Sequence, residues 1–277
     1  MKTVHPLRHA PAALVALFSC PLSGSAQSPA ELRAGVEEIL GGSPVASVTS
    51  DVEASFTERV AALGGDLTSD EIARVSRAVG EAFASAAMRS DVVDFMATEA
   101  ASGDMDRVLS WYREGSSAEV RESEQAYVPS LSLDEFAFQL ETSVPLPARI
   151  ALMQRWVSAQ SAGDFSIILE EVSREVAHEV LRALRGDAPD FAELSRAAYE
   201  QAHDRYTRSA VLSFLYRFEP VPDEVLAKVV DEYESEAGQW FVETYTFAIA
   251  EAVWLAGQRA ARTLAGDAVS RTWSGVR

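Results

Sequence analysis

The fold is organised around residues 229–255, which read VVDEYESEAGQWFVETYTFAIAEAVWL. Tyr233 is expected to close one helix. Ser235 is expected to cap the next, because its hydroxyl can accept hydrogen bonds from the free N–H groups of a first helical turn. Gly238 has no side chain and lets a neighbouring helix approach closely. The segment is therefore predicted to be a tight joint between two helices.

The helix predicted after this joint is the most apolar one in the chain, interrupted only by Glu243 and Glu251. Its apolar residues fall all round a helical wheel, and such a helix is buried at a centre or at an interface. Four aromatic side chains make it a candidate interaction surface: Trp240, Phe241, Tyr245 and Trp254.

Helix start signals recur along the chain, and no segment alternates apolar and polar residues between hairpin turns. Ser28 followed by Glu31, and Thr68 followed by Glu71, have the spacing of capping boxes. The chain is therefore predicted to be all-α. Helices are expected at residues 28–41, 43–63, 69–88, 91–101, 105–114, 117–127, 133–141, 148–160, 164–184, 190–218, 223–233 and 236–264.

An internal duplication is indicated when the chain is compared with itself at an offset of 121 residues. Tyr112 then meets Tyr233 and Gly42 meets Gly163, and the matches cluster at helix ends and turns. We therefore expect two pseudo-repeated bundles of about five helices each, either separate or packed as one unit. The predicted boundaries are 28–130 and 148–265 for the repeats, 131–147 for a short helix with a proline-containing linker, and 266–277 for a tail.

The joint itself, Tyr233-Glu234-Ser235-Glu236-Ala237-Gly238-Gln239, resembles the FYxSPxGQ signature of an exported bacterial family known as domain of unknown function 2059. This sequence departs from the signature at Glu232, Glu234 and Glu236. The upstream copy has Trp111, Tyr112 and Ser116 but lacks the Gly-Gln pair. The resemblance implies an exported helical protein and carries no activity, since none is assigned to the family.

The first residues are typical of a signal peptide. Lys2 and Arg8 precede an apolar run at 12–18, and small residues follow, so we expect removal of residues 1–26 by cleavage after Ala26 and a periplasmic location. In an alternative, Cys20 would become the lipidated first residue of a lipoprotein. No later segment is apolar enough to predict a transmembrane span.

Composition limits the classes of partner. The chain has 277 residues with a formal net charge of −18, and losing two basic residues with the signal peptide makes it −20. This acid excess repels nucleic acid and anionic lipids. Cys20 is the single cysteine, so cleavage would leave neither a disulfide nor a thiol nucleophile.

One motif suggests metal chemistry. Glu175 and His178 form an E-x-x-H pair, as do Glu200 and His203, and this spacing occurs in carboxylate-bridged di-iron bundles. The apolar stripe of the first helix predicts that His178 points nearly opposite its buried face, which argues against inward ligation. A structural or solvated role is therefore expected for these residues, and no metal or other cofactor is predicted.

Other catalytic patterns are missing from the sequence: it has no G-x-S-x-G elbow, and Gly41-Gly42 and Gly64-Gly65 have the character of helix C-caps. The predicted function is a non-catalytic periplasmic interaction or accessory module that binds an unknown protein or a second copy of itself. Two alternatives are a carrier whose aromatic helix lines a cavity for an apolar ligand, and a di-iron or other metal-binding helical-bundle enzyme that uses the E-x-x-H pairs.

Overall fold

A computed structural model describes residues 28–41, 56, 58–60, 62, 65, 67–100, 102–126, 130–140, 147–186 and 195–274. This part of the chain is all-α, as the sequence predicts, and contains no strand. Its helices are α1 (Pro29–Gly41), α3 (Ser69–Ala82), α4 (Ser85–Glu99), α5 (Ser102–Glu114), α6 (Ser116–Ala126), α7 (Leu133–Leu140), α8 (Pro147–Ala159), α9 (Ala162–Arg185), α10 (Arg196–Arg217), α11 (Asp223–Glu234) and α12 (Glu236–Ser274).

Local capping signals define several helix starts. The Thr68 side chain accepts from the Glu71 amide while the Glu71 carboxylate accepts from the Thr68 amide, which completes the predicted capping box of α3. Ser28 and Glu31 make the same reciprocal pair of bonds at α1. Both helices therefore begin where the sequence predicts.

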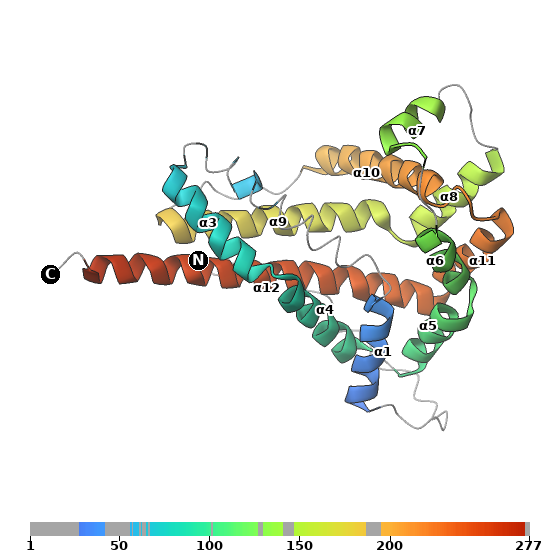
Figure 1. The fold of residues 1–277 in the computed structure, drawn as a ribbon, viewed down its shortest axis with the longest axis horizontal. Coiled ribbons are helices and arrows are strands. Elements are labelled where there is room, and N and C mark those ends of the chain that lie inside the picture. Colours follow the sequence, from blue (N-terminus) through green and yellow to red (C-terminus); the bar gives the residue numbers. More distant parts are fainter. Residues whose placement is uncertain are drawn as a thin grey trace.

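The apolar helix α12 is the central element. It packs along α9 over much of its length and also contacts α3, α4, α5 and α11, as Figure 1 shows. Ile249 and Val253 are fully buried, and Phe247 is exposed. Because neighbours cover α12 on several sides, an apolar residue can be buried at most positions round this helix.

The two sequence halves do not form separate cores. The larger hydrophobic cluster combines residues of α1, α3, α4 and α5 with residues of α9 and α12. The smaller cluster places Val120 of α6 among residues of α7, α8, α10 and α11. Helices from each half therefore complete the core of the other, and the halves pack as one unit.

Helices α5 and α11 begin at Ser102 and Asp223, 121 residues apart in the chain. Each has an ion pair near its C-terminal end with an earlier helix of the chain, α1 for α5 and α8 for α11. Arg113 of α5 binds Glu38 of α1 at 2.7 Å, and Glu234 of α11 binds Arg155 of α8 at 2.7 Å. The charges are reversed while the pairing of elements is the same.

Some helix ends differ from the expected ones. The helix predicted at 69–88 stops at Ala82, and α4 starts at Ser85. Between them, Phe83 is buried and stacks on Phe56 with ring centroids 4.9 Å apart. The helix is therefore interrupted where the Phe83 ring packs into the core, although neither Gly nor Pro lies at this position. Helix α12 continues past the expected end at Leu264, to Ser274, through much of the predicted tail.

Several predictions fall outside the described residues: the signal peptide at 1–26 with Cys20, most of the helix expected at 43–63, and the linker around 141–146. Within the described helices, none is both long enough and apolar enough to cross a membrane.

Candidate binding cavity

The joint between α11 and α12 is held by its own side chains. Ser235 donates its hydroxyl to the Glu232 carbonyl at 2.6 Å and accepts from the Gly238 amide at 3.1 Å, so it ends α11 and caps α12 together. A Cβ on Gly238 would lie 2.6 Å from the Tyr233 carbonyl oxygen, closer than real Cβ atoms come. Only glycine fits this turn without a shift of the backbone.

The Gln239 side chain extends the same joint to a third helix. Its amide donates to the Tyr233 carbonyl at 2.7 Å and to the Ala159 carbonyl at the end of α8 at 2.8 Å. The Tyr, Ser, Gly and Gln of the signature-like segment thus all have structural roles at one junction of helices.

The upstream joint, between α5 and α6, contacts the downstream one directly. Helix α6 begins at Ser116, and its cap comes from across the molecule. The Glu232 carboxylate accepts from the Ser116 amide at 3.2 Å and from the Ser117 hydroxyl at 2.8 Å. A carboxylate of the downstream joint therefore accepts from the first turn of α6, where the two joints meet.

Aromatic rings from both halves surround this meeting point. Trp111 packs edge-on to Tyr233 with centroids 5.3 Å apart and to Phe241 at 6.2 Å. The series continues along α12 to Tyr245 at 5.9 Å from Phe241, and on to Phe165 of α9 at 6.2 Å from Tyr245. The rings form a connected wall from α5 to α9.

This wall borders a cavity of about 340 Å³. Helices α5, α6, α8, α9, α10, α11 and α12 all contribute to its lining. The described lining residues are Val108, Trp111, Tyr112, Ser117, Val120, Arg121, Trp156, Gln160, Ala162, Phe165, Phe214, Arg217, Phe218, Val229, Tyr233, Phe241, Val242, Tyr245 and Thr246. A volume of several hundred Å³ with aromatic walls and few polar groups is typical of a small-molecule site.

Burial controls the few polar groups in this lining. Burial raises the pKa of the Tyr233 hydroxyl to about 12, so the group stays protonated over the physiological range. Partial burial of its guanidinium also lowers the pKa of Arg217, although the residue as a whole is exposed. The Arg121 guanidinium lies over the Tyr112 ring, 3.5 Å from its centroid, and donates to the Tyr112 carbonyl at 2.7 Å.

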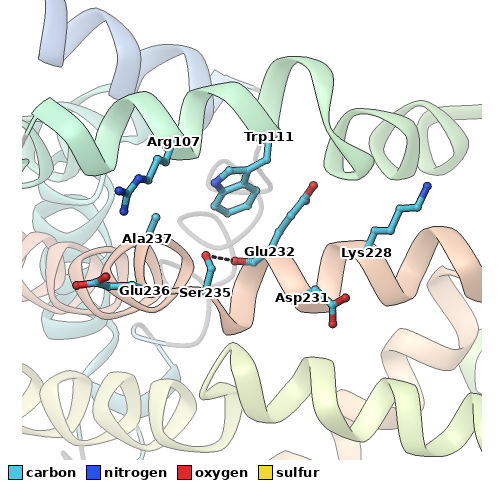
Figure 2. A pocket seen from close by; sticks show the side chains of 8 residues that line it. All are labelled: Arg107, Trp111, Lys228, Asp231, Glu232, Ser235, Glu236 and Ala237. Atoms are coloured by element: carbon cyan, nitrogen blue, oxygen red, sulfur yellow. Dashed lines mark hydrogen bonds between the residues drawn. The ribbon is translucent and has the colours of Figure 1, made fainter. Parts of the chain in front are cut away.

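A surface hollow adjoins the cavity at Trp111. Figure 2 shows Trp111 of α5 facing the Glu232–Ser235 turn, with Arg107 and Lys228 also in the lining and Glu232 extending toward α5 and α6. The lining of this hollow carries mixed charges from Lys228, Asp231 and Glu236 among others, unlike the aromatic cavity. We therefore take the cavity as the candidate site.

The E-x-x-H pairs do not form a common site. His203 lies beside Asp164, at the start of α9, with His203 Nε2 3.8 Å from Asp164 Oδ1. His178 lies fourteen residues further along α9, about 21 Å away at 1.5 Å per residue. Among the described residues, no three His, Cys, Asp or Glu side chains are grouped as metal ligands.

His178 lies off the apolar stripe of α9, yet its side chain is only 5% exposed, so the expectation that this side of the helix is not buried was wrong. Helix α9 is covered by α12 on one side and by α10 and α3 on others, so residues beyond its apolar stripe are buried too. The other candidates are nearer the surface. Glu175 is half-buried, and Glu200 is exposed and pairs with Arg196 at 2.9 Å.

The four aromatic residues proposed as an interaction surface divide into two pairs. Phe241 and Tyr245 line the cavity. Trp240 and Trp254 are half-buried and pack against the larger hydrophobic cluster. Sequence reasoning did not single out Arg121, Trp156 or Phe214. The aromatic residues that cluster at 214–218 could have drawn attention to this region, but no local signal brings Arg121 to the same place.

Fold and site together define an all-α protein with an aromatic cavity where two helix joints meet. No protein-family model, curated protein or solved structure matches the chain.

Proposed function

We propose that the protein is a non-catalytic binding protein that holds a small apolar molecule in the aromatic cavity. One observation carries this proposal: a space of about 340 Å³ surrounded by aromatic rings from both halves of the chain. Native cores are close-packed and contain few voids larger than a water molecule. A partly open apolar space of this size, lined by seven helices, is better suited to a ligand than to stability.

The aromatic series supports a bound molecule with an apolar body. Edge-on and stacked ring contacts are favourable at centroid separations of about 4.5–7 Å, and a flat guest can extend such a series. Trp156 stacks on Phe218 at 4.5 Å, and both rings line the cavity together with Phe241 and Tyr245. The lining residues that the structure describes include neither an activated nucleophile nor a paired acid and base, which favours binding over catalysis.

A cavity-filling variant tests this proposal. Ala162 lines the cavity at the start of α9, and Ala162→Phe would place a ring in the space. The probe is N-phenyl-1-naphthylamine, an uncharged dye whose emission rises in apolar surroundings. We expect saturable binding of one dye per wild-type chain and an affinity at least about tenfold weaker for Ala162→Phe.

The matched control is Ala151→Phe, which adds the same ring at an exposed position of α8 outside the cavity. It should bind the dye as wild type does, and all three proteins should show helical circular dichroism of equal strength. Wild-type protein that shows no saturable dye binding, or Ala162→Phe protein that binds as tightly as wild type, would refute the proposal.

We further propose that the chain is exported to the periplasm after cleavage at Ala26, with lipidation at Cys20 as the alternative. The charged start and apolar run of residues 1–26 support export. The resemblance of Tyr233–Gln239 to the signature of family 2059 supports the same location. Mass spectrometry of the protein from a periplasmic fraction tests it: a mature chain beginning at Gln27 is expected, and an uncleaved chain would contradict it.

A second candidate function, self-association as an accessory module, is favoured by one stripe on α12. Trp240, Phe247 and Trp254 are seven residues apart, so they share one face of the helix, and Phe247 is 36% exposed. Light scattering at increasing protein concentration is the test. A dimer that dissociates on Phe247→Glu substitution is expected, whereas a monomer at every concentration would dismiss this candidate.

A further inference from the structure

The charge of the cavity lining is opposite to that of the chain. The protein has 42 Asp and Glu against 24 Lys and Arg. The described lining nevertheless contains two arginines, Arg121 and Arg217, and neither Asp nor Glu. In so acidic a chain, an aromatic cavity with only cationic charges points to a negatively charged guest.

Arg121 holds part of its guanidinium ready for a partner. One nitrogen, Nη2, donates to the Tyr112 carbonyl at 2.7 Å, and the plane lies over the Tyr112 ring. The other terminal nitrogen, Nη1, is buried and has no acceptor within hydrogen-bonding distance among the described residues. Buried polar groups are almost always hydrogen-bonded, so such a donor requires an explanation.

Two further lining residues show the same feature. The indole Nε1 atoms of Trp111 and Trp156 are buried and likewise have no acceptor within the described part of the chain. All three unmatched groups are donors. They have almost no accessible surface, so the acceptor oxygens of a guest would reach them after small side-chain shifts, whereas a hydrocarbon would leave them unmatched.

We propose that the cavity binds a small amphipathic molecule with an aromatic or alkyl body and one carboxylate, and that Arg121 and Arg217 hold the carboxylate. This inference rests on the function proposed above and names its ligand class. A guanidinium matches a carboxylate with two parallel hydrogen bonds, and the aromatic rings contact the apolar body. Since burial lowers the pKa of Arg217, a bound anion also stabilises the charged form of this side chain.

The test compares two probes of nearly equal shape, 1-naphthaleneacetate and the uncharged 1-naphthaleneacetamide, by isothermal titration calorimetry. Wild-type protein should bind the acetate at least about tenfold more tightly than the amide, as expected for a charge-assisted hydrogen bond in a desolvated site. Arg121→Gln and Arg217→Gln should each weaken acetate binding by about tenfold. Neither should change amide binding by more than about twofold.

The matched control is Arg107→Gln, on the same helix as Trp111 but outside the cavity lining. It should leave the affinity for both probes unchanged. Amide binding also reports whether each variant retains a folded cavity, and Arg217→Gln remains decisive if Arg121→Gln disturbs α6. Equal affinity of the two probes for wild type, or equal weakening of both by Arg217→Gln, overturns the carboxylate proposal while the apolar-ligand function stands. If neither probe binds, the carboxylate proposal and the apolar-ligand function are both overturned.

Discussion

Glu232→Ala is the sharpest structural test of the contact between the two joints. The Glu232 carboxylate accepts from the Ser116 amide and the Ser117 hydroxyl, and so caps a helix that is over a hundred residues away in the sequence. Removing a helix cap costs about 0.5–2 kcal/mol, and a hydrogen bond to a charged group contributes about 1.5–3 kcal/mol. Because these two contributions overlap, we expect a loss of about 2 kcal/mol in the free energy of unfolding.

In a chain of this size, a loss of about 2 kcal/mol lowers the Tm by about 4–8 °C. Urea unfolding followed by circular dichroism measures the free energy, and hydrogen exchange locates the effect. The amides in the first turn of α6 should lose the most protection. Glu232→Gln keeps an acceptor for the Ser116 amide but removes the charge beside the helix start, so its loss should be about half as large.

A double-mutant cycle isolates the contact. Ser117→Ala alone removes the hydroxyl donor and should cost about 1 kcal/mol, and the cycle with Glu232→Ala should give a coupling energy of about 1 kcal/mol. The control is Glu243→Ala, at an exposed position of α12, with an expected change below about 0.5 kcal/mol. A Glu232→Ala protein no less stable than the control, or a coupling energy near zero, would refute the proposed capping between joints.

Two further predictions concern the packing around α9. A Cβ on Gly257 of α12 would lie 2.9 Å from a methyl carbon of Val176, so Gly257→Ala should destabilise the protein by about 1–3 kcal/mol. Gly266 lies in the same helix, but a Cβ there would have no neighbour within 4 Å, so Gly266→Ala should be neutral or stabilising by up to about 1 kcal/mol. Thermal unfolding that ranks the two variants the other way would contradict this prediction. The second prediction concerns pH: a hydrogen bond from Arg185 of α9, with the bonds to Thr68, lowers the pKa of Glu71 to about 2. The stabilisation by this carboxylate is therefore fully present above its unfolded pKa near 4.5 and is lost as the pH falls toward 2. Glu71→Gln preserves the capping geometry but removes the charge. In urea titrations, this variant should be less stable than wild type at pH 7 and equally stable near pH 2. A difference that is independent of pH would argue against the Arg185 contribution.

The sequence predicted the parts of the structure that depend on neighbouring residues. The all-α class, the capping boxes at Ser28 and Thr68 and the joint at Ser235 follow from bonds between groups three or four residues apart. The burial of most of α12 followed from apolar residues on every side of one helix. These features need no knowledge of what the helix packs against.

The wrong predictions concern residues whose positions depend on contacts with other parts of the chain. His178 is buried although it lies off the apolar stripe of α9, because further helices cover that face. The predicted helix at 69–88 breaks at Phe83, where the ring packs against Phe56. Periodicity describes one face of one helix, and it does not report how many neighbours surround that helix.

By itself, the sequence determined the all-α class, the capping boxes at Ser28 and Thr68 and the joint at Ser235, because short-range hydrogen bonds and apolar periodicity depend on residues close together in the chain. The tertiary structure alone decided that the joints face each other, that Glu232 caps the helix at Ser116, and that Arg121 lies among the aromatic rings of both halves. Such contacts join residues more than a hundred positions apart. They depend on how the helices cross, which is set by the packing of the whole core.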